Sequence, residues 1–402
     1  MKVAIIGGGA AGFFAAFSVK KHHPDATVCI YEKSAKVLSK VKVSGGGRCN
    51  VCNSCTEISK LIKNYPRGEK FLKKAFHQFQ TKDTIDWFQK RGVKLKEETD
   101  QRMFPESNDS QTIIDCFLKE KSKLNIDLKL KSPVQDLKAL PNGTFQFNVN
   151  GKTTQVDKVI VAFGGSPMLK GFEILSKLQI NIIEPIPSLF TFNMTTEPIK
   201  ALMGVSVSDV DCSIVGTKLK SSGPLLITHW GMSGPAILKL SAFGAIDLHK
   251  MNYDFSVRVN WMKIASETEA KKELRSWFEN SLGKQIGNCP PIFLSKRLWH
   301  FLLEASEIPI EKPIKELGSK QENRLINTLI NSQFKVKGKT TFKEEFVTAG
   351  GVDLNEIDSH TMQHKTISNL YFAGEVLNID AVTGGFNFQA AWTTGFIAGK
   401  IV

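Results

Sequence analysis

Near the amino terminus, glycines are spaced as in a turn that binds phosphate groups. The run from Gly7 to Gly12 reads G-G-G-A-A-G and fits the pattern G-x-G-x-x-G. In this pattern Gly7 permits a tight turn, Gly9 lets the backbone approach a pyrophosphate, and Gly12 allows a helix to pack against a strand. Free amides and the positive end of the helix dipole then face the anion. The chemistry expected at this turn is therefore the binding of a dinucleotide.

Such a turn needs a strand before it and a helix after it, and the sequence provides both. Residues 2–6 are β-prone, an alanine- and phenylalanine-rich helical stretch follows the glycines, and a second strand is expected over residues 27–31. Glu32 ends that strand, 20 residues after Gly12, where a carboxylate accepts hydrogen bonds from adenosine ribose hydroxyls. A glycine-rich turn beside a surface glutamate is the alternative interpretation. The register of strand, turn, helix, strand and acid favours the dinucleotide.

Two further strand ends favour FAD over NAD. The β-prone runs 159–162 and 369–373 both end at glycines, the first before Gly164 and the second before Gly374 and Glu375. Doubly wound sheets bind ligands at the carboxyl ends of their strands, so these positions would contact the same extended ligand. No second G-x-G-x-x-G follows a strand, so a dedicated nicotinamide domain is not indicated.

A basic loop with three consecutive glycines is the next candidate site. Residues 44–50 read S-G-G-G-R-C-N, a backbone that is able to lie flat against a ligand and present amides to it. Arg48 adds a fixed positive charge, which beside the N1/O2 edge of an isoalloxazine ring would stabilise the anionic reduced flavin. A plain flexible basic loop is the alternative.

Three cysteines overlap this loop. Cys49, Cys52 and Cys55 follow the spacing C-x-x-C-x-x-C, which is typical of part of a ferredoxin ligand set or of a redox disulfide. The fourth cluster ligand is missing, because the one Cys-Pro lies far away at Cys289. Incidental thiols are the favoured interpretation, a redox-active pair stays open, and no metal is expected.

His229 is the ionisable residue best placed to move a proton. Residues 228–234 read T-H-W-G-M-S-G and put an imidazole and the Ser233 hydroxyl in a turn at the end of an expected strand. Imidazole titrates near neutral pH and is able to transfer a proton while a flavin transfers a hydride. A structural histidine, hydrogen-bonded within the turn, is the alternative.

Composition sets the wider limits. A chain of 402 residues predicts two or three domains at roughly 150 residues each, and 42% hydrophobic with 23% charged residues is ordinary globular usage. The 53 Lys and Arg against 39 Asp and Glu, a net charge of +14, attract phosphates, anionic metabolites or nucleic acid. Seven mostly dispersed cysteines indicate a reducing compartment, so a cytoplasmic location is expected. Glycines interrupt the uncharged stretch 3–19, so neither a signal peptide nor a membrane span is expected.

The middle of the chain differs from both ends in its pattern of β-prone and helix-prone runs. Residues 188–340 contain β-prone runs followed by a charged, helix-prone part, whereas residues 341–402 continue the pattern of the first domain. We therefore predict a discontinuous FAD-binding domain, 1–187 with 341–402, interrupted by an inserted β-rich and helical domain, 188–340. The predicted class is α/β, with a Rossmann-like doubly wound sheet.

Motifs along nearly the whole chain carry a resemblance to a known family. They are Gly7 to Gly12 with Glu32, Ser44 to Asn50 with Asn53, Arg102 to Pro105, Thr228 to Pro235, Thr348 to Val352 with Thr361 and Met362, Leu370 to Asn378, and Thr383 to Ala391. In these motifs the chain resembles the BaiN-type flavoproteins, which are also called aminoacetone-oxidase-family or NAD(P)/FAD-dependent oxidoreductases. The resemblance implies that the insert is a small β-barrel with a helical subdomain that packs over the flavin, with the substrate entering between the domains. After Gly165 the family's usual loop is shortened, and Asn378 stands where the family has Asp, so the substrate-side geometry is not carried over.

The site residues predicted from the motifs and the resemblance form two groups. The residues expected to be catalytic are His229, Ser233 and Arg48. The residues expected to hold FAD are Gly7, Gly9, Ala10, Ala11, Gly12, Glu32, Lys33, Ser44, Gly45, Gly46, Gly47, Arg48, Cys49, Asn50, Val134, Ala162, Gly164, Gly374, Glu375, Gly384, Gly385, Phe386 and Asn387.

The resulting hypothesis is an FAD-dependent oxidoreductase that transfers a hydride between a small organic substrate and the flavin. NAD(P)H-driven reduction of an activated C=C bond, with NAD(P)H as a transient electron donor, is the version suggested by the family name. The alternatives are a flavin-dependent amine oxidase, an RNA-modifying or nucleic-acid-binding flavoprotein, and a flavin-stabilised binding protein. A nucleic acid is a less expected partner than a small molecule, no membrane partner is expected, and no oligomeric state is predicted.

Overall fold

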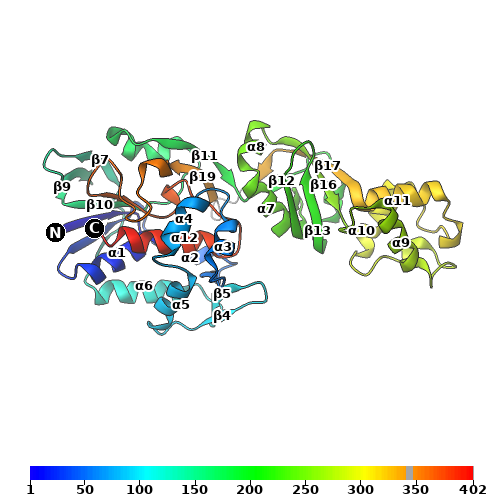
Figure 1. Ribbon diagram of the computed structural model, residues 1–402, viewed down its shortest axis with the longest axis horizontal. Helices are drawn as coiled ribbons and strands as arrows, with labels where there is room; N and C mark the ends of the chain where they lie inside the picture. Colours follow the sequence, from blue (N-terminus) through cyan, green and yellow to red (C-terminus); the bar gives the residue numbers. More distant parts are fainter. Residues whose placement is uncertain (341–346, 402) are drawn as a thin grey trace. The chain divides into compact units, whose positions relative to one another are not determined.

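The structure, a computed structural model, describes residues 1–340 and 347–401 (Figure 1). The chain forms two compact units, Met1–Ser188 with Phe342–Val402 and Leu189–Thr341. Residues 341–346 and 402 of the predicted FAD-binding domain lie outside the described residues. The first unit is discontinuous, because the chain leaves it, builds the second unit and then returns.

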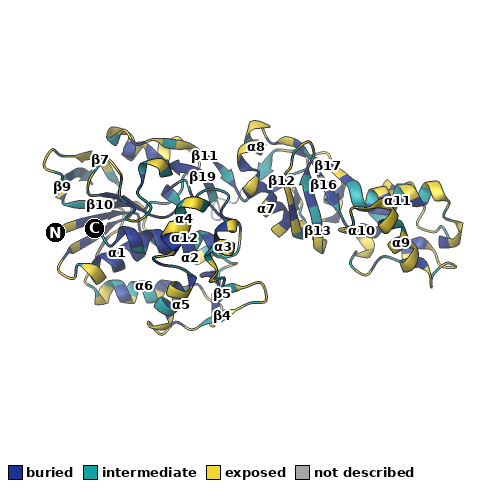
Figure 2. Cartoon of the chain, in the orientation of Figure 1, coloured by how far each residue is buried: buried dark blue, intermediate teal, exposed yellow. Residues whose placement is uncertain are grey.

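The first unit is built on a five-stranded parallel sheet. Its strands are β1 (Lys2–Ile6), β2 (Thr27–Tyr31), β6 (Asp127–Lys129), β10 (Lys158–Val161) and β20 (Leu370–Phe372). They lie in the order β20-β10-β1-β2-β6, and each neighbouring pair is parallel. Parallel strands that are covered on both faces consist of near-continuous apolar runs, and the last four residues of β1 are buried (Figure 2). This sheet confirms the predicted α/β class.

Two helices of the first unit approach each other closely. They are α1 (Ala10–His22) and α12 (Phe386–Ala398), and most residues of both are buried. A Cβ at Gly395 would stand 2.6 Å from Ala11 O, and one at Gly399 would stand 2.4 Å from Ala15 O. Only glycines allow this approach, so the last helix of the chain is fixed beside the first.

The other elements of the first unit lie on the connections between these strands. They are α2 (Ser39–Val43), α3 (Ile58–Leu61), α4 (Glu69–Phe76), α5 (Thr81–Gln89), α6 (Gln111–Lys123), β3 (Cys52–Asn53), β4 (Leu95–Glu97), β5 (Arg102–Pro105), β7 (Val134–Ala139), β8 (Phe145–Val149), β9 (Lys152–Val156), β11 (Ile182–Ser188) and β19 (Val347–Val352). Strands β11 and β19 pair antiparallel, so the segment that leads into the second unit is bonded to the segment that returns.

The second unit contains a curled antiparallel sheet. Its strands are β12 (Thr191–Asn193), β13 (Ser206–Ile214), β14 (Lys220–Ile227), β15 (Gly231–Ser233), β16 (Asp254–Asn260), β17 (Ser332–Lys337) and β18 (Lys339–Thr340). They lie in the order β17-β16-β13-β14-β15-β12-β18, and every neighbouring pair is antiparallel. The two strands at the ends of this order are joined by Gly338 alone, at a φ of +91°. The sheet therefore curls toward a barrel.

Helices complete the second unit. They are α7 (Pro235–Phe243), α8 (Ala245–Lys250), α9 (Glu267–Phe278), α10 (Lys296–Ala305) and α11 (Ser319–Asn331). Serine side chains cap two of them: Ser266 Oγ accepts from Glu269 N (3.4 Å) before α9, and Ser295 Oγ accepts from Leu298 N (3.3 Å) before α10.

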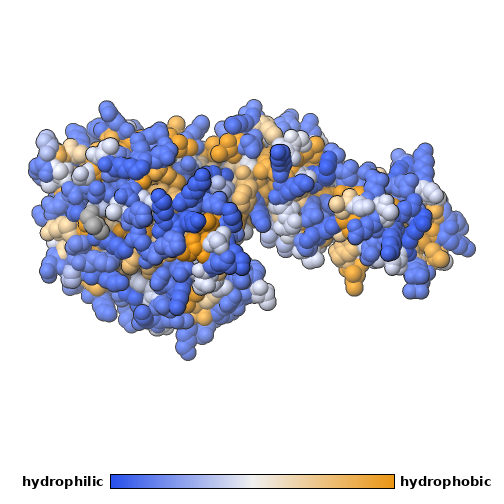
Figure 3. Space-filling model, in the orientation of Figure 1, coloured by the Kyte–Doolittle hydropathy of each residue, from blue (hydrophilic) through white to orange (hydrophobic). Residues whose placement is uncertain are grey.

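The surface agrees with the ordinary composition. In the face drawn in Figure 3, hydrophilic residues predominate and apolar areas are small. Throughout residues 1–340 and 347–401, each helix is too short or too polar to cross a membrane.

Candidate functional site

The turn after β1 is tightly packed except where a pyrophosphate would lie. Gly7 has a φ of +116°, and a Cβ there would stand 2.5 Å from Ala162 O. A Cβ at Gly12 would stand 2.0 Å from Gly7 O, whereas a Cβ at Gly9 would meet no atom within 4 Å. Gly9 precedes α1, and no side chain caps this helix. The backbone amides at the start of α1, including those of Ala10 and Ala11, thus face an open space suited to an anion.

Glu32 stands at the side of this turn. Its Oε2 accepts from Gly8 N (2.8 Å), and its Oε1 accepts from Ser34 N (2.8 Å). Its backbone carbonyl accepts from Ser132 N (2.8 Å), which brings the segment leading into Val134 alongside. Ser34 Oγ also donates to Oε1 (2.7 Å), and since a carboxylate has about four lone-pair sites, Glu32 retains one for a ribose hydroxyl. Lys33 follows it and is exposed.

The three-glycine loop has the open backbone that its sequence predicts. Gly45, Gly46 and Gly47 have φ values of +59°, +67° and +84°, and a Cβ at either of the last two would meet no atom within 4 Å. The Ser44 carbonyl accepts from the amides of Gly47 (3.1 Å) and of Cys49 (3.0 Å), which closes the loop on itself. The exposed glycine backbone is therefore held in one shape by residues that do not block it.

Asn50 joins this loop to the start of α12. With its amide oriented to satisfy both neighbours, Asn50 accepts from Gly385 N (2.9 Å) and donates to Cys52 O (3.1 Å). A Cβ at Gly385 would stand 2.4 Å from the carbonyl carbon of Cys52. Two segments that the sequence predicts at the flavin, far apart along the chain, thus lie side by side.

Arg48 is engaged by a partner that sequence reasoning missed. Its Nη1 donates to Glu98 Oε1 (2.6 Å), and its guanidinium lies over the ring of Phe104, 4.0 Å from the centroid. Glu98 also accepts from Arg102 (3.1 Å), so the two arginines share one carboxylate. The contact of Arg48 with the flavin ring remains a prediction.

Around Glu375, the carboxyl ends of two strands converge. Glu375 Oε1 accepts from Thr348 N (2.9 Å), and its Oε2 pairs with Lys40 Nζ (2.5 Å). A Cβ at Gly165, which follows β10 and Gly164, would stand 2.7 Å from Thr348 Oγ1. The buried Thr348 hydroxyl has no hydrogen-bond partner among the described residues. Gly165, Thr348 and Glu375 are therefore packed against one another at the carboxyl end of β10.

On the other side, Gly374 contacts the first helix directly. A Cβ there would stand 2.7 Å from the Cβ of Ala11, and Gly374 N donates to Thr394 Oγ1 in α12 (2.8 Å). The end of β20 therefore lies against the phosphate-binding turn.

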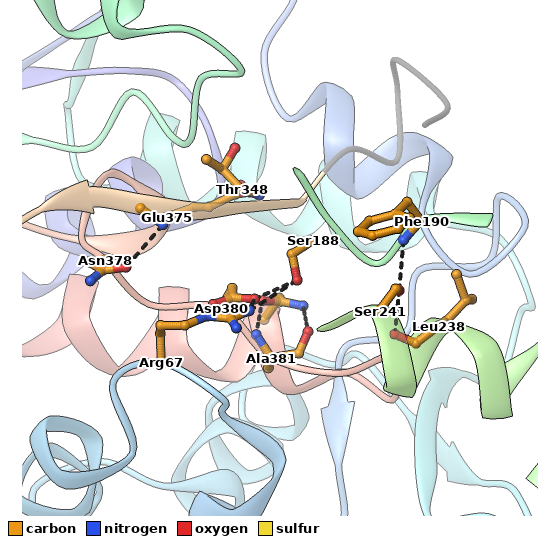
Figure 4. Close-up of polar contacts among 12 residues, drawn as sticks. Arg67, Ser188, Phe190, Leu238, Ser241, Thr348, Glu375, Asn378, Asp380 and Ala381 are labelled. Atoms are coloured by element: carbon orange, nitrogen blue, oxygen red, sulfur yellow. Dashed lines mark hydrogen bonds and ion pairs between the residues drawn. The ribbon is translucent and has the colours of Figure 1, made fainter. Parts of the chain in front are cut away.

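The loop before α12 is fixed by two polar clamps. Asn387 accepts from Ala381 N (2.9 Å) and donates to Ala381 O (3.0 Å). Asp380, fully buried, pairs with Arg67, whose Nε donates over 2.5 Å, and accepts from Ser188 Oγ (2.6 Å) (Figure 4). Burial raises the pKa of the Asp380 carboxyl, and Arg67 and Ser188 oppose that shift. Gly384 and Gly385, ahead of Phe386, are therefore held in place, and no side chain caps α12.

Taken together, the first unit fits an extended dinucleotide such as FAD. The backbone is open at Gly9, and the Glu32 carboxylate lies beside the phosphate-binding turn. The three-glycine loop adjoins the start of α12, which no side chain caps. These features are the donors and acceptors that a pyrophosphate, a ribose and a flavin ring require.

In the second unit, His229 lies at the tip of a hairpin between β14 and β15. The side chain is exposed, and its ring centroid is 4.7 Å from that of Trp230. Ser233 lies within β15, where its hydroxyl accepts from Thr191 Oγ1 (3.1 Å). Ser233 thus has a bonding partner inside the sheet, and the catalytic roles of both residues remain predictions.

The cysteine cluster forms no disulfide. All seven cysteines are free, and Cys49 and Cys52 are buried. Burial raises the pKa of the Cys49 thiol to about 12 and that of Cys52 further. Thiols protonated at neutral pH are poor nucleophiles, so the geometry supports the incidental interpretation.

Comparisons with known proteins extend along the whole chain. The family model for the HI0933-like protein Rossmann domain matches residues 1–401. A "Ribosomal RNA dihydrouridine synthase" of Escherichia coli (strain K12) is 30% identical over 401 residues, 98% of this chain and 95% of the relative. A "3-dehydro-bile acid delta(4,6)-reductase" of Clostridium scindens is 26% identical over 411 residues, 99% of this chain and 98% of the relative. A solved 3-ketosteroid-delta4-(5alpha)-dehydrogenase from Rhodococcus jostii RHA1 shares the fold, with a TM-score of 0.51 and 13% identity over 99% of this chain and 96% of that one.

Proposed function

The chain belongs to the HI0933-like Rossmann family and is an FAD-dependent oxidoreductase, and within this activity we propose that it reduces the C5=C6 bond of a uridine in ribosomal RNA. Membership of the family confirms the predicted BaiN-type resemblance and the FAD cofactor. The observation that carries the proposal is the full-length similarity to the Escherichia coli relative, whose name denotes this reaction. The net charge of +14 supports a polyanionic substrate.

The proposed reaction divides the work between cofactor and protein. FAD, when bound and reduced by NAD(P)H, would supply the hydride for one carbon of a conjugated C=C bond. The amides at Gly9 and the start of α1 would bind the pyrophosphate, Glu32 would accept from a ribose hydroxyl, and the three-glycine loop would orient the ring. His229 holds the proton that the second carbon receives. The balance is one hydride and one proton for each C=C bond, with NAD(P)⁺ released.

A second substrate class has a specific observation in its favour. The Clostridium scindens relative, named for a bile-acid reductase, is 26% identical over 99% of this chain. Its name also denotes reduction of C=C bonds, so the two relatives share a bond type and differ in substrate. A steroid enone is therefore the competing candidate.

The test follows the flavin and the product. The purified protein is mixed anaerobically with NADH or NADPH, and the bleached flavin is then offered unmodified ribosomal RNA or a steroid enone. We expect reoxidation by the RNA, with dihydrouridine detected by mass spectrometry. Reoxidation by the enone and not by the RNA would replace the proposal with the steroid reductase. Bleaching of the oxidised flavin by an amine, followed by reoxidation with oxygen, would favour the oxidase.

A further inference from the structure

The hairpin between β14 and β15 presents two aromatic rings on a rigid tip. Thr228 N donates to Gly231 O (2.7 Å), and Gly231 N donates to Thr228 O (3.2 Å), which leaves His229 and Trp230 as a two-residue loop. The Thr228 hydroxyl also accepts from the amides of Trp230 and Gly231, each over 3.3 Å. The backbone polar groups of the turn are thus used internally, and the side chains of His229 and Trp230 are exposed.

Trp230 is unusual among the tryptophans of this chain. All six lie in the described residues, and Trp230 is the exposed one, at 45% of its full surface. By contrast, 1% or less of the surface is exposed in Trp261, Trp299 and Trp392. A large exposed indole on a fixed turn is costly to leave in water, so a partner that covers it would gain free energy.

Two cations are anchored on a segment that is hydrogen-bonded to the hairpin. The segment 194–204 runs along the hairpin, because Met194 N donates to Trp230 O (2.8 Å) and Gly204 N donates to Ile227 O (2.9 Å). From this segment Lys200 Nζ donates to Thr195 O (2.6 Å). Arg297 donates to Ala201 O (2.8 Å). Backbone carbonyls hold both cations in place without neutralising them.

The same segment also carries an exposed apolar side chain. Met203, on the same segment, is 56% exposed, and its carbonyl accepts from Arg297 (3.4 Å). The combination of a flat indole, an imidazole, a thioether and two cations is typical of surfaces that bind unpaired nucleotides, since bases stack on aromatic rings and phosphates pair with cations.

We propose that the His229–Trp230 tip, with Lys200, Met203 and Arg297, is a stacking platform for an unpaired base of RNA. The inference rests on the proposed function and deepens it, because it assigns the contact that holds the substrate strand. Every base has a π face, so the platform accepts any unpaired base, and the cations bind the neighbouring phosphates. A base stacked on Trp230 lies beside His229, because the ring centroids of His229 and Trp230 are 4.7 Å apart.

The test uses the flavin-loaded full-length chain and a fluorescently labelled oligouridine. Stacking is worth about tenfold in affinity or more, so Trp230→Ala weakens binding about tenfold and Trp230→Phe restores most of it. Oligouridine also quenches tryptophan emission in the parent protein, and the quenching disappears in Trp230→Phe. Arg297→Gln lowers the slope of log affinity against log salt by about one.

A matched control lies in the same unit. Trp277 in α9 is half-buried, and its Nε1 donates to Glu273 (3.0 Å), so Trp277→Phe leaves binding and quenching unchanged. Flavin content and thermal melting confirm that each variant is folded.

The outcomes separate this inference from the proposed function. If Trp230→Ala binds oligouridine and modifies ribosomal RNA as well as the parent does, the platform is wrong and the function stands. If the parent neither binds oligouridine nor modifies ribosomal RNA, both are wrong. If a steroid enone quenches Trp230 and oligouridine does not, the patch binds an apolar ligand instead.

Discussion

The two turns on which the proposed function depends are built in opposite ways. In the first unit, glycines precede α1 and α12, no side chain caps either helix, and open space stands where Gly9 would carry a Cβ. In the second unit, the turn from Thr228 to Gly231 bonds its own backbone and uses a hydroxyl to cap two amides. The first turn therefore offers its backbone to a ligand, and the second offers its side chains.

The two units also treat a buried carboxylate differently. Asp380 in the first unit is fully buried and its partner Arg67 is 10% exposed, so burial outweighs pairing and raises the pKa of the carboxyl. Glu322 in the second unit is 10% exposed, but its partner Arg275 is 64% exposed. There the hydrogen bonds from Arg275 and Lys271 outweigh burial and lower the pKa of Glu322. Removing the arginine partner should therefore cost more stability at Asp380 than at Glu322.

The largest effect is expected from Arg67→Ala. This change leaves the Asp380 carboxylate buried without its cation, which costs about 3–5 kcal/mol of unfolding free energy. Urea unfolding of flavin-stripped protein measures the loss. The double variant Arg67→Met with Asp380→Leu removes both charges and should recover much of the stability. An Arg67→Ala midpoint equal to that of the parent would show that the pair does not hold the loop before α12.

His229→Gln tests whether the second turn acts through its side chain. The His229 ring forms no hydrogen bond to the residues that the structure describes, so its replacement should leave the turn intact. Losing a general acid slows the proton-transfer step by about 100-fold or more. Stopped-flow reoxidation of reduced flavin by substrate measures that step, with flavin content as the check on folding. Parental reoxidation rates would contradict the proton-transfer role of His229.

How far the sequence predicts this site depends on the range of the contacts. The phosphate turn is local: strand, glycines, helix and Glu32 follow one another, so their spacing is sufficient to predict the arrangement. The pair of Arg67 and Asp380 joins residues 313 positions apart, and no periodicity or motif connects them.

Arg48 shows the limit of reasoning from charge. Its neighbours in the sequence are the three glycines, yet the carboxylate that it contacts, Glu98, directly follows β4 and lies 50 residues away. The pairing of β4 with β5, and of β5 with β3 shortly after Arg48, brings Glu98 near, and that register depends on tertiary packing.

Gly9→Ala tests whether the first turn binds through its backbone. The position has a φ of −92° and room for a Cβ, so the stability of flavin-stripped protein should change by less than about 0.5 kcal/mol. The added methyl fills the space meant for the pyrophosphate, and we expect FAD affinity to fall about tenfold, or about 1.4 kcal/mol. Gly12→Ala is the contrast, because its Cβ would meet Gly7 O at 2.0 Å and should destabilise the fold itself by about 1–3 kcal/mol. Full flavin retention in Gly9→Ala would contradict pyrophosphate binding at this turn.

The smallest effect concerns the pH dependence of the second unit. Because the pKa of Glu322 is lower in the folded state than its ordinary value of 4.5, ionised Glu322 stabilises the fold above pH 4.5, and this contribution is lost as the pH falls below it. Arg275 is largely solvated, so the contribution should stay below about 1 kcal/mol. Urea unfolding of the parent and of Glu322→Gln over a pH series measures the difference, which should be constant near neutral pH and shrink in acid. A difference that grows as the pH falls would mean that burial, and not pairing, dominates at Glu322 as it does at Asp380, and the contrast between the two units would disappear.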